Sequence, residues 1–178
     1  MKILKFPSLR QTFEYDCGPT ALQSVLLYYG IEKRKDEIID IVGTDRHGTS
    51  PQKMVKSIKK FGLKCKHGKL TLRQVEKNLD KKIPVILLIQ AWPYIDEPTV
   101  DWENEWRHGH YVIAIGYNKK GICFEDPFSF YRSYVTKEEL LKRWHDIDAR
   151  TKKKHLHFGI AVYGKKHAYK PNKIIPIG

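Results

Sequence analysis

A cysteine near the start of the chain lies where a helix would increase its reactivity. Apolar residues after Cys17 recur at the spacing of an amphipathic helix, which Gly30 would end. Asp16 is then the expected N-cap, and Cys17 falls in the first turn, where unpaired N–H groups and the helix dipole stabilise a thiolate. Pro19 suits the same turn because first-turn N–H groups have no partner to lose. The pattern predicts a nucleophilic thiol, although a small buried cysteine is the commoner use of this residue.

Two groups that would assist a thiol lie at the ends of a predicted β-hairpin. Residues 110–117 and 122–126 are apolar runs joined by the turn-forming sequence Asn-Lys-Lys-Gly. An antiparallel return brings Asp126, at the end of the second strand, beside His110, at the start of the first. A cysteine acyl-transfer site needs such a thiolate, an imidazole and a group that orients the imidazole. The alternatives are an exposed histidine at a strand end and a turn-forming aspartate before Pro127.

These positions carry a resemblance to a known family. Gln11, the sequence Asp-Cys-Gly around Cys17, the run from His110 to Gly116 and the pair Asp126-Pro127 resemble the bacteriocin-leader (double-glycine) peptidases, a branch of the papain-like cysteine peptidases. The resemblance covers about residues 11–126. It implies that the cysteine is the nucleophile, the histidine the general base, the aspartate its orienting partner and the glutamine part of the oxyanion hole. Six residues before the cysteine, Gln11 is able to aim its amide at the same site as the Cys17 N–H.

The resemblance favours a cysteine peptidase that cleaves a peptide bond through a Cys17 thioester, with a Gly-Gly end as the first sequence to try. We therefore expect a peptide or protein substrate. One alternative is a non-catalytic peptide-binding domain of the same fold, but such relatives typically lack the nucleophile. Another is a thiol acyltransferase, because the same residues permit transfer to an amine or thiol in place of water. Many members of the family are domains of larger membrane exporters, so the substrate does not follow from the resemblance.

Two alternating histidine pairs raise the alternative of a zinc site. His108 with His110, and His155 with His157, would each point to one face of a strand. No acidic or thiolate ligand stands at a comparable spacing, and His110 already has a role. We therefore expect neither a metal nor another cofactor.

Residues 91–109 form an aromatic and acidic segment in a basic chain. The segment joins the most apolar predicted strand directly to the strand that begins with His110. We therefore expect it to border the active site, with Trp102 and Trp106 binding substrate. A packed Ω-loop is the structural alternative. Its other notable residues are Trp92, Tyr94, Asp96, Glu97, Asp101, Glu103, Glu105 and Arg107.

The composition is that of a globular enzyme with reduced thiols. With 178 residues, of which 41% are hydrophobic, the chain suits one domain spanning residues 1–178, in which residues 165–178 form an extended tail. Three cysteines are an odd number without the spacing of a metal clip, so a disulfide framework is not expected. Cys65 and Cys123 stand in apolar surroundings and are expected in the core.

The formal charge of +13 does not by itself indicate nucleic-acid binding. Lysines are spread along the whole chain and accompany no recognised nucleic-acid motif, so a solvated basic surface is the preferred interpretation. No apolar run approaches the roughly 18 to 20 residues that span a bilayer, and the N-terminus lacks a signal-peptide core. We expect a soluble, cytoplasmic protein without a membrane segment.

The coarse pattern is a helical N-terminal part followed by an antiparallel sheet, which is an α+β, papain-like arrangement. The run at residues 83–89 is apolar throughout and predicts a strand buried on both faces. Helices are expected at 17–29, at 35–42, from Pro51 after an N-cap at Ser50, from Thr71 and from Thr136, and strands at 3–6, 63–66, 83–89, 110–117, 122–126 and 155–163.

Overall fold

The computed structural model describes residues 1–94 and 99–177, and these form an α+β fold. The helices are α1 (Cys17–Tyr28), α2 (Lys35–Val42), α3 (Pro51–Lys60), α4 (Leu72–Asp80) and α5 (Lys137–Arg143). The strands are β1 (Lys2–Ile3), β2 (Lys64–Lys69), β3 (Val85–Gln90), β4 (Gly109–Tyr117), β5 (Gly121–Glu125), β6 (Ser133–Thr136), β7 (His145–Ile147), β8 (Lys154–Leu156) and β9 (Phe158–Tyr163). The predicted fold class is confirmed.

One antiparallel sheet organises the molecule. Its strands run in the order β2, β9, β3, β4, β5 and β6, and β1 pairs with the far end of β4. Every residue of β3 is buried, as the apolar run predicted, because β9 and β4 flank the strand and helices cover both faces. Strands β7 and β8 form a separate hairpin.

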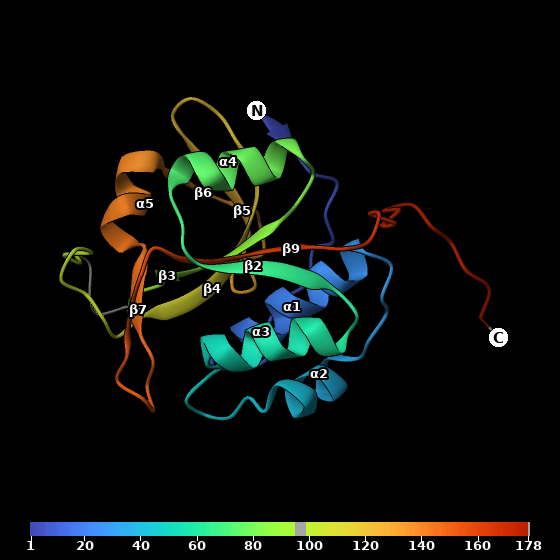
Figure 1. Ribbon diagram of the computed structural model, residues 1–178, viewed down its shortest axis with the longest axis horizontal. Helices are drawn as coiled ribbons and strands as arrows, with labels where there is room; N and C mark the ends of the chain where they lie inside the picture. Colours follow the sequence, from blue (N-terminus) through green and yellow to red (C-terminus); the bar gives the residue numbers. More distant parts are fainter. Residues whose placement is uncertain (95–98, 178) are drawn as a thin grey trace.

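The helices divide between the two faces of the sheet (Figure 1). Helices α1, α2 and α3 pack on one face, where Leu88 and Ile113 belong to the core, while α4 and α5 pack on the other, with Leu87 and Val112. Neighbouring strand residues thus serve opposite cores, as the two-residue repeat of a strand requires. We call these two surfaces the α1 face and the α5 face.

Helix α1 is the central helix of the α1 face. Ten of its twelve residues are buried, so it is less amphipathic than the sequence pattern suggested. The N-cap is Asp16, but its side chain does not cap the helix. The buried carboxylate instead accepts backbone hydrogen bonds from Thr12, at 3.1 Å, and Phe13, at 3.2 Å. Asp16 therefore fixes the loop that precedes the cysteine.

Helix ends predicted from capping residues agree closely with the structure. Ser50 accepts a hydrogen bond from the backbone of Lys53, with Pro51 in the first turn. Thr71 and Gln74 form a complete capping box at the start of α4. Thr136 caps α5 through the Glu139 N–H. These signals work because they depend only on residues close in sequence.

The prediction of a single strand at residues 155–163 is wrong. His157 has a φ of 52° and divides the segment into β8 and β9, which belong to different sheets. Its ring stacks on Trp144 with 5.2 Å between the centroids, and its N–H bonds to the Trp144 carbonyl at 2.8 Å. This contact lies 13 residues away in sequence, so alternation along the strand could not reveal it. Strands β6 and β7 were also not predicted.

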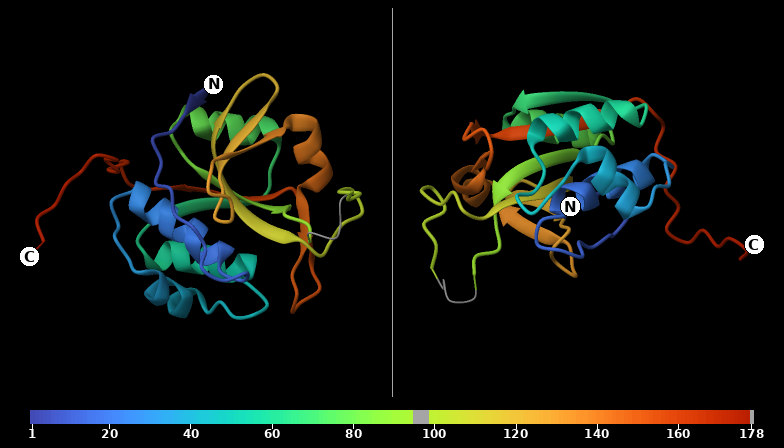
Figure 2. Two further views of the ribbon diagram at one scale, coloured as in Figure 1. Left: turned by 180° about the vertical axis from the view of Figure 1, so that it is seen from behind. Right: turned by 90° about the horizontal axis from the view of Figure 1, so that it is seen from below.

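The C-terminal segment begins against α1 and then leaves the body of the molecule (Figure 2). The backbone N–H groups of Ala168 and Tyr169 both donate to the Tyr28 carbonyl, and His167 stacks on the Tyr28 ring. Beyond this anchor, Ile174 and Ile177 are exposed. Within the described residues, no helix combines the length and the hydrophobicity needed to cross a bilayer.

Substitution of Gly18 by alanine should destabilise the fold by about 1–3 kcal/mol, because the new Cβ overpacks a close contact. A Cβ at Gly18 would lie 2.7 Å from Thr49 Oγ1 and 2.8 Å from Thr49 Cβ. The free energy of unfolding in urea measures the loss. The same substitution should cost clearly less in a Thr49→Gly background, and an equal loss in both backgrounds would contradict the contact as the cause.

Candidate active site

Cys17 begins α1, as predicted, and its thiol is buried beside the sheet. The helix is held close to the loop before α3, because Gly18 leaves room for Thr49. Tyr111, the residue after His110, fixes the same loop by donating its hydroxyl to the Thr49 carbonyl at 3.0 Å. The start of α1, the loop before α3 and the sheet thus meet at Cys17.

The hairpin of β4 and β5 brings His110 to Asp126. Ile113 pairs with Glu125, so continuing this register places Asp126 opposite Val112. His110 lies two residues earlier on the same side of β4, which makes the histidine and the aspartate diagonal neighbours. His110 Nε2 and Asp126 Oδ1 are 2.8 Å apart, and the Cys17 thiol is close enough to the imidazole to raise its pKa. The predicted group of three is therefore assembled.

The electrostatics of this group favour a charged imidazole. Burial by itself lowers the pKa of His110, but the hydrogen bonds to Asp126 and Cys17 and the charges of the same two groups raise it to about 9. The imidazole is thus protonated at neutral pH, and the negative group that it faces is the Asp126 carboxylate.

Asp126 is held by more partners than the sequence suggested. Burial raises its pKa, but the bond to His110 and further hydrogen bonds bring it below the usual value. Oδ1 also accepts from the Phe128 N–H at 3.0 Å, and Oδ2 accepts from Ser133 Oγ at 2.8 Å and from Trp92 Nε1 at 3.0 Å. Trp92 has a φ of 58°, a conformation that bulky residues rarely adopt.

Gln11 lies in the loop before α1, but its amide faces the backbone of that loop. Nε2 donates to the Phe13 carbonyl at 3.0 Å, and Oε1 is a buried atom without a hydrogen-bond partner in the described part of the chain. The backbone N–H of Gln11 donates to the Pro127 carbonyl at 2.8 Å, which joins this loop to the segment after Asp126. One amide hydrogen of Gln11 is therefore not used in the Phe13 bond.

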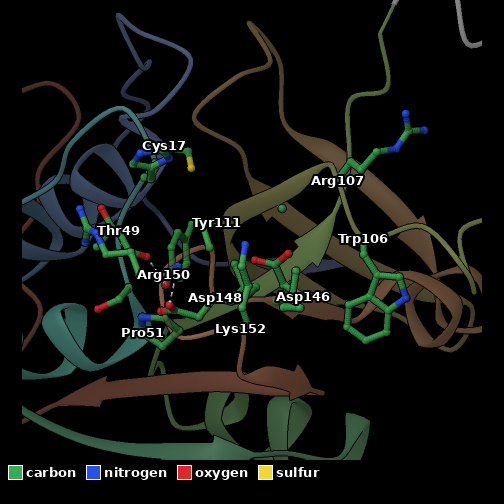
Figure 3. A pocket seen from close by; sticks show the side chains of 17 residues that line it. Cys17, Thr49, Pro51, Trp106, Arg107, Tyr111, Asp146, Asp148, Arg150 and Lys152 are labelled. Atoms are coloured by element: carbon green, nitrogen blue, oxygen red, sulfur yellow. Dashed lines mark hydrogen bonds between the residues drawn. The ribbon is translucent and has the colours of Figure 1, made fainter.

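A pocket of about 290 Å³ opens beside Cys17. Figure 3 shows Cys17 at one end of the pocket and Trp106 at the other, with Asp146 between them. Trp106 lies against His145, with 4.4 Å between the ring centroids, and under Lys154. Of the two tryptophans predicted to bind substrate, Trp106 thus lies on the side of the cysteine.

Trp102 lies on the other face of the sheet. It borders a separate depression together with Val112, Phe124 and Arg143, and the Arg143 guanidinium stacks on its ring at 4.1 Å. The two tryptophans therefore border different depressions, and the one at Trp102 also includes Trp92 and Asp126. Asp96 and Glu97 of the same segment lie outside the described residues.

Asp146 is a pocket residue that sequence analysis did not identify. Burial raises its pKa to about 6, although Gln90 Nε2 donates to Oδ1 at 2.9 Å. The carboxylate lies over Gly109, where a Cβ would be 2.5 Å from both oxygens. No local pattern marks this residue, because β7 is 36 residues beyond His110 and reaches the pocket only through the tertiary fold.

The remaining cysteines and His155 lie away from the catalytic group. Cys123 is buried and Cys65 is half-buried, and burial raises the pKa of both thiols. His155 lies against the Phe158 ring. Across the residues that the structure describes, no three His, Cys, Asp or Glu side chains gather as a metal site would require.

Replacing the Asp126 carboxylate by an amide should lower the pKa of His110. Asp126→Asn keeps a hydrogen-bond acceptor but removes the negative charge, so the titration midpoint should fall from about 9 by about one to three pH units. The midpoint can be followed through the imidazole C–H signals in NMR spectra. The signals of His155 and His157 serve as internal controls, and an unchanged His110 midpoint would contradict the assigned role of Asp126.

Asp146→Asn should stabilise the protein in a pH-dependent way. The folded-state pKa of Asp146 is about 6, above the ordinary 3.8, so ionisation of this carboxyl destabilises the folded state. The destabilisation is fully present above pH 6 and absent below about pH 4. The substitution should therefore raise the free energy of unfolding by roughly 1–3 kcal/mol at pH 8. Urea unfolding at pH 4 and pH 8 measures the difference. An equal gain at both values would exclude the charge as its cause.

Comparison with known proteins identifies the family. Residues 5–155 match the Peptidase C39 family. The lactococcin-A transport/processing ATP-binding protein LcnC of Lactococcus lactis is 27% identical over 150 residues, which cover 83% of this chain and 19% of that protein. The chain matches about half or less of the length of the curated relatives.

Solved structures share the fold. A putative C39-like peptidase from Bacillus anthracis superposes with a TM-score of 0.70 at 18% identity, covering 93% of this chain and 98% of that one. A double glycine motif protease from an AMS/PCAT transporter, solved with its leader peptide, gives 0.63 at 18% identity, covering 90% of this chain and 93% of that one. The predicted resemblance is confirmed, and so is the enzyme class of the family, cysteine peptidase. The chain belongs to the Peptidase C39 family.

Proposed function

We propose that this protein cleaves peptide bonds through a thioester on Cys17, with His110 as acid and base, Asp126 as its orienting partner and Gln11 as an oxyanion donor. The observation that carries the proposal is the 2.8 Å contact of His110 with buried Asp126, on an imidazole whose pKa the neighbouring Cys17 thiol also raises. A histidine held between a thiol at a helix start and a buried carboxylate is the arrangement that thiol acyl transfer needs.

In the first half of the reaction, the Cys17 sulfur attacks the carbonyl carbon of the substrate. Its electrons form a C–S bond, and the carbonyl oxygen becomes an oxyanion that accepts from the Cys17 backbone N–H and from the free hydrogen of the Gln11 amide. The oxyanion collapses, the C–N bond breaks, and protonated His110 gives its proton to the departing amine. The products are a thioester and a free amine.

In the second half, neutral His110 takes a proton from water while the water oxygen attacks the thioester carbon. The C–S bond breaks, a carboxylic acid leaves, and the sulfur and imidazolium return as the starting pair. Asp126 keeps the imidazole in one orientation throughout, because Trp92, Ser133 and the Phe128 N–H fix its carboxylate. Asp126 takes no part in bond making.

The substrate that we propose is a peptide or protein cut after a Gly-Gly-type sequence. Support comes from the double glycine motif protease and from the processing protein LcnC, whose names state these activities. We place the reaction in the cytoplasm, which suits three free cysteines. Transfer of the acyl group to an amine is the second candidate, because Cys17, His110 and Asp126 serve either acceptor equally.

Variants of the four residues should lose activity in a defined order. Cys17→Ala should abolish thioester formation, and His110→Ala should be nearly as severe, because the leaving amine then has no proton donor. Gln11→Ala should lower turnover by about 10²- to 10³-fold, with the Cys17 N–H still in place. Asp126→Ala should retain residual turnover. Cleavage of a Gly-Gly peptide, followed by mass spectrometry, measures all four.

A matched control separates catalysis from folding. Cys123→Ala removes a buried thiol remote from His110 and should leave turnover within a few-fold of the wild type while iodoacetamide still labels Cys17 first. Retained cleavage by Cys17→Ala would overturn the peptidase assignment. Peptide binding without any cleavage by the wild-type protein would favour the non-catalytic alternative.

A further inference from the structure

A second depression, distinct from the pocket beside Cys17, is lined by aromatic side chains. It has a volume of about 460 Å³ and lies between the loop before α1 and the segment after Asp126. We call it the aromatic groove. Its lining residues are Gln11, Thr12, Phe13, Glu14, Trp92, Phe128, Ser129, Phe130 and Tyr131.

The rings of the groove are unusually exposed for their size. Phe13 is 50% exposed, Phe128 52%, Tyr131 83% and Phe130 86%. Such a cluster of exposed aromatic rings is unfavourable in water and marks a surface that binds an apolar partner. Trp92 and Phe128 already contact each other, with 4.9 Å between the centroids.

The backbone under these rings is fixed from within the protein. The Arg10 guanidinium donates to Glu125 at 2.7 Å and to the Phe130 carbonyl at 2.9 Å. The Gln11 N–H bonds to the Pro127 carbonyl, which ties the two walls together. The groove thus exists before a ligand arrives, which lowers the entropic cost of binding.

The groove is continuous with the catalytic group. The Trp92 indole that forms one of its walls donates to the same Asp126 carboxylate that orients His110. Gln11, the proposed oxyanion donor, lines it too, and the buried Gln11 Oε1 atom has no hydrogen-bond partner among the described residues.

A peptide in the site extends away from the cysteine in two directions. The pocket beside Cys17 touches the nucleophile and so suits the half that remains as the thioester. The other half receives its proton from His110, and the aromatic groove lies on the Asp126 side of that imidazole. The two depressions share no lining residue, so each is available to one half of the substrate.

We propose that the aromatic groove binds the departing half of the substrate and selects a large apolar or aromatic side chain within the first two residues after the cleaved bond. This specificity rests on the proposed peptidase function and extends it to the leaving side. Glu14 is an acidic side chain at the groove, so an acidic residue at these positions should be disfavoured.

The test compares substrates that differ only after the cleaved bond. One is a Gly-Gly methyl ester, whose small methoxy leaving group leaves the groove empty, while the others continue Gly-Gly with Phe, Leu, Ala or Asp. The Phe and Leu peptides should show kcat/KM at least about tenfold above Ala, since burying such a side chain contributes that much or more. Asp should fall below Ala.

A double substitution, Phe130→Ser with Tyr131→Ser, should reduce the Phe-over-Ala ratio to about threefold or less while the rate on the methyl ester, which does not reach the groove, is unchanged. The matched control, Ile174→Ser with Ile175→Ser, removes exposed apolar side chains from the C-terminal segment and should keep the full ratio. A retained ratio in the groove variant would overturn the proposal.

A second readout does not depend on the cleavage rate. Phenylalaninamide or alaninamide added during methyl ester hydrolysis attacks the Cys17 thioester, forming an amide bond and releasing the thiolate. Phenylalaninamide should capture about tenfold more acyl product than alaninamide, measured by mass spectrometry. Turnover of the methyl ester with equal capture and equal Phe and Ala rates would overturn the proposed groove specificity and leave the peptidase function standing. No Cys17-dependent turnover of any substrate would overturn both.

Discussion

The diagonal pairing of His110 with Asp126 across the β4–β5 hairpin is the interaction on which the site depends. It is produced by register, because the Ile113–Glu125 and Ala114–Phe124 pairs leave the histidine and the aspartate on one side of the hairpin. A shift of one residue would move one of them to the opposite face. The Asn118 side chain accepts from the backbone of Lys120 and Gly121 at 2.8 Å and so holds the link. A register shift between Ala114 and Gly116 then moves the pairing by one residue and produces the Ile113–Glu125 pair.

Cys17 lies on a different part of the chain from His110 and Asp126. The loop before α1 and the segment after β5 must therefore be held against each other. Buried Asp16 organises the loop before α1 through the Thr12 and Phe13 N–H groups, and Lys35 of α2 lies 3.6 Å from the same carboxylate. Arg10 and Gln11 then bond to Glu125, Pro127 and the Phe130 carbonyl. The loop that carries the oxyanion donor is therefore anchored on the segment that carries the orienting aspartate.

Local signals in the sequence predicted the parts that depend on neighbouring residues. The helix starts at Ser50 and Thr71, the buried strand β3 and the hairpin of His110 and Asp126 all follow from patterns a few residues long. The same reasoning could not find Asp146 or Ser133, which come to the site from strands placed by tertiary packing. It also predicted Asp16 as a helix cap, whereas the buried Asp16 carboxylate accepts hydrogen bonds from the loop that precedes the helix.

The unfavourable backbone conformation of Trp92 gives its side chain two roles. A tryptophan with positive φ costs on the order of 1–3 kcal/mol, and the fold must compensate for that strain elsewhere. The conformation aims the indole N–H at Asp126 and leaves the ring against Phe128, so the same side chain orients the carboxylate and forms the wall of the aromatic groove. The hydrogen-bond partner of the orienting carboxylate and the wall of the proposed groove are therefore the same residue.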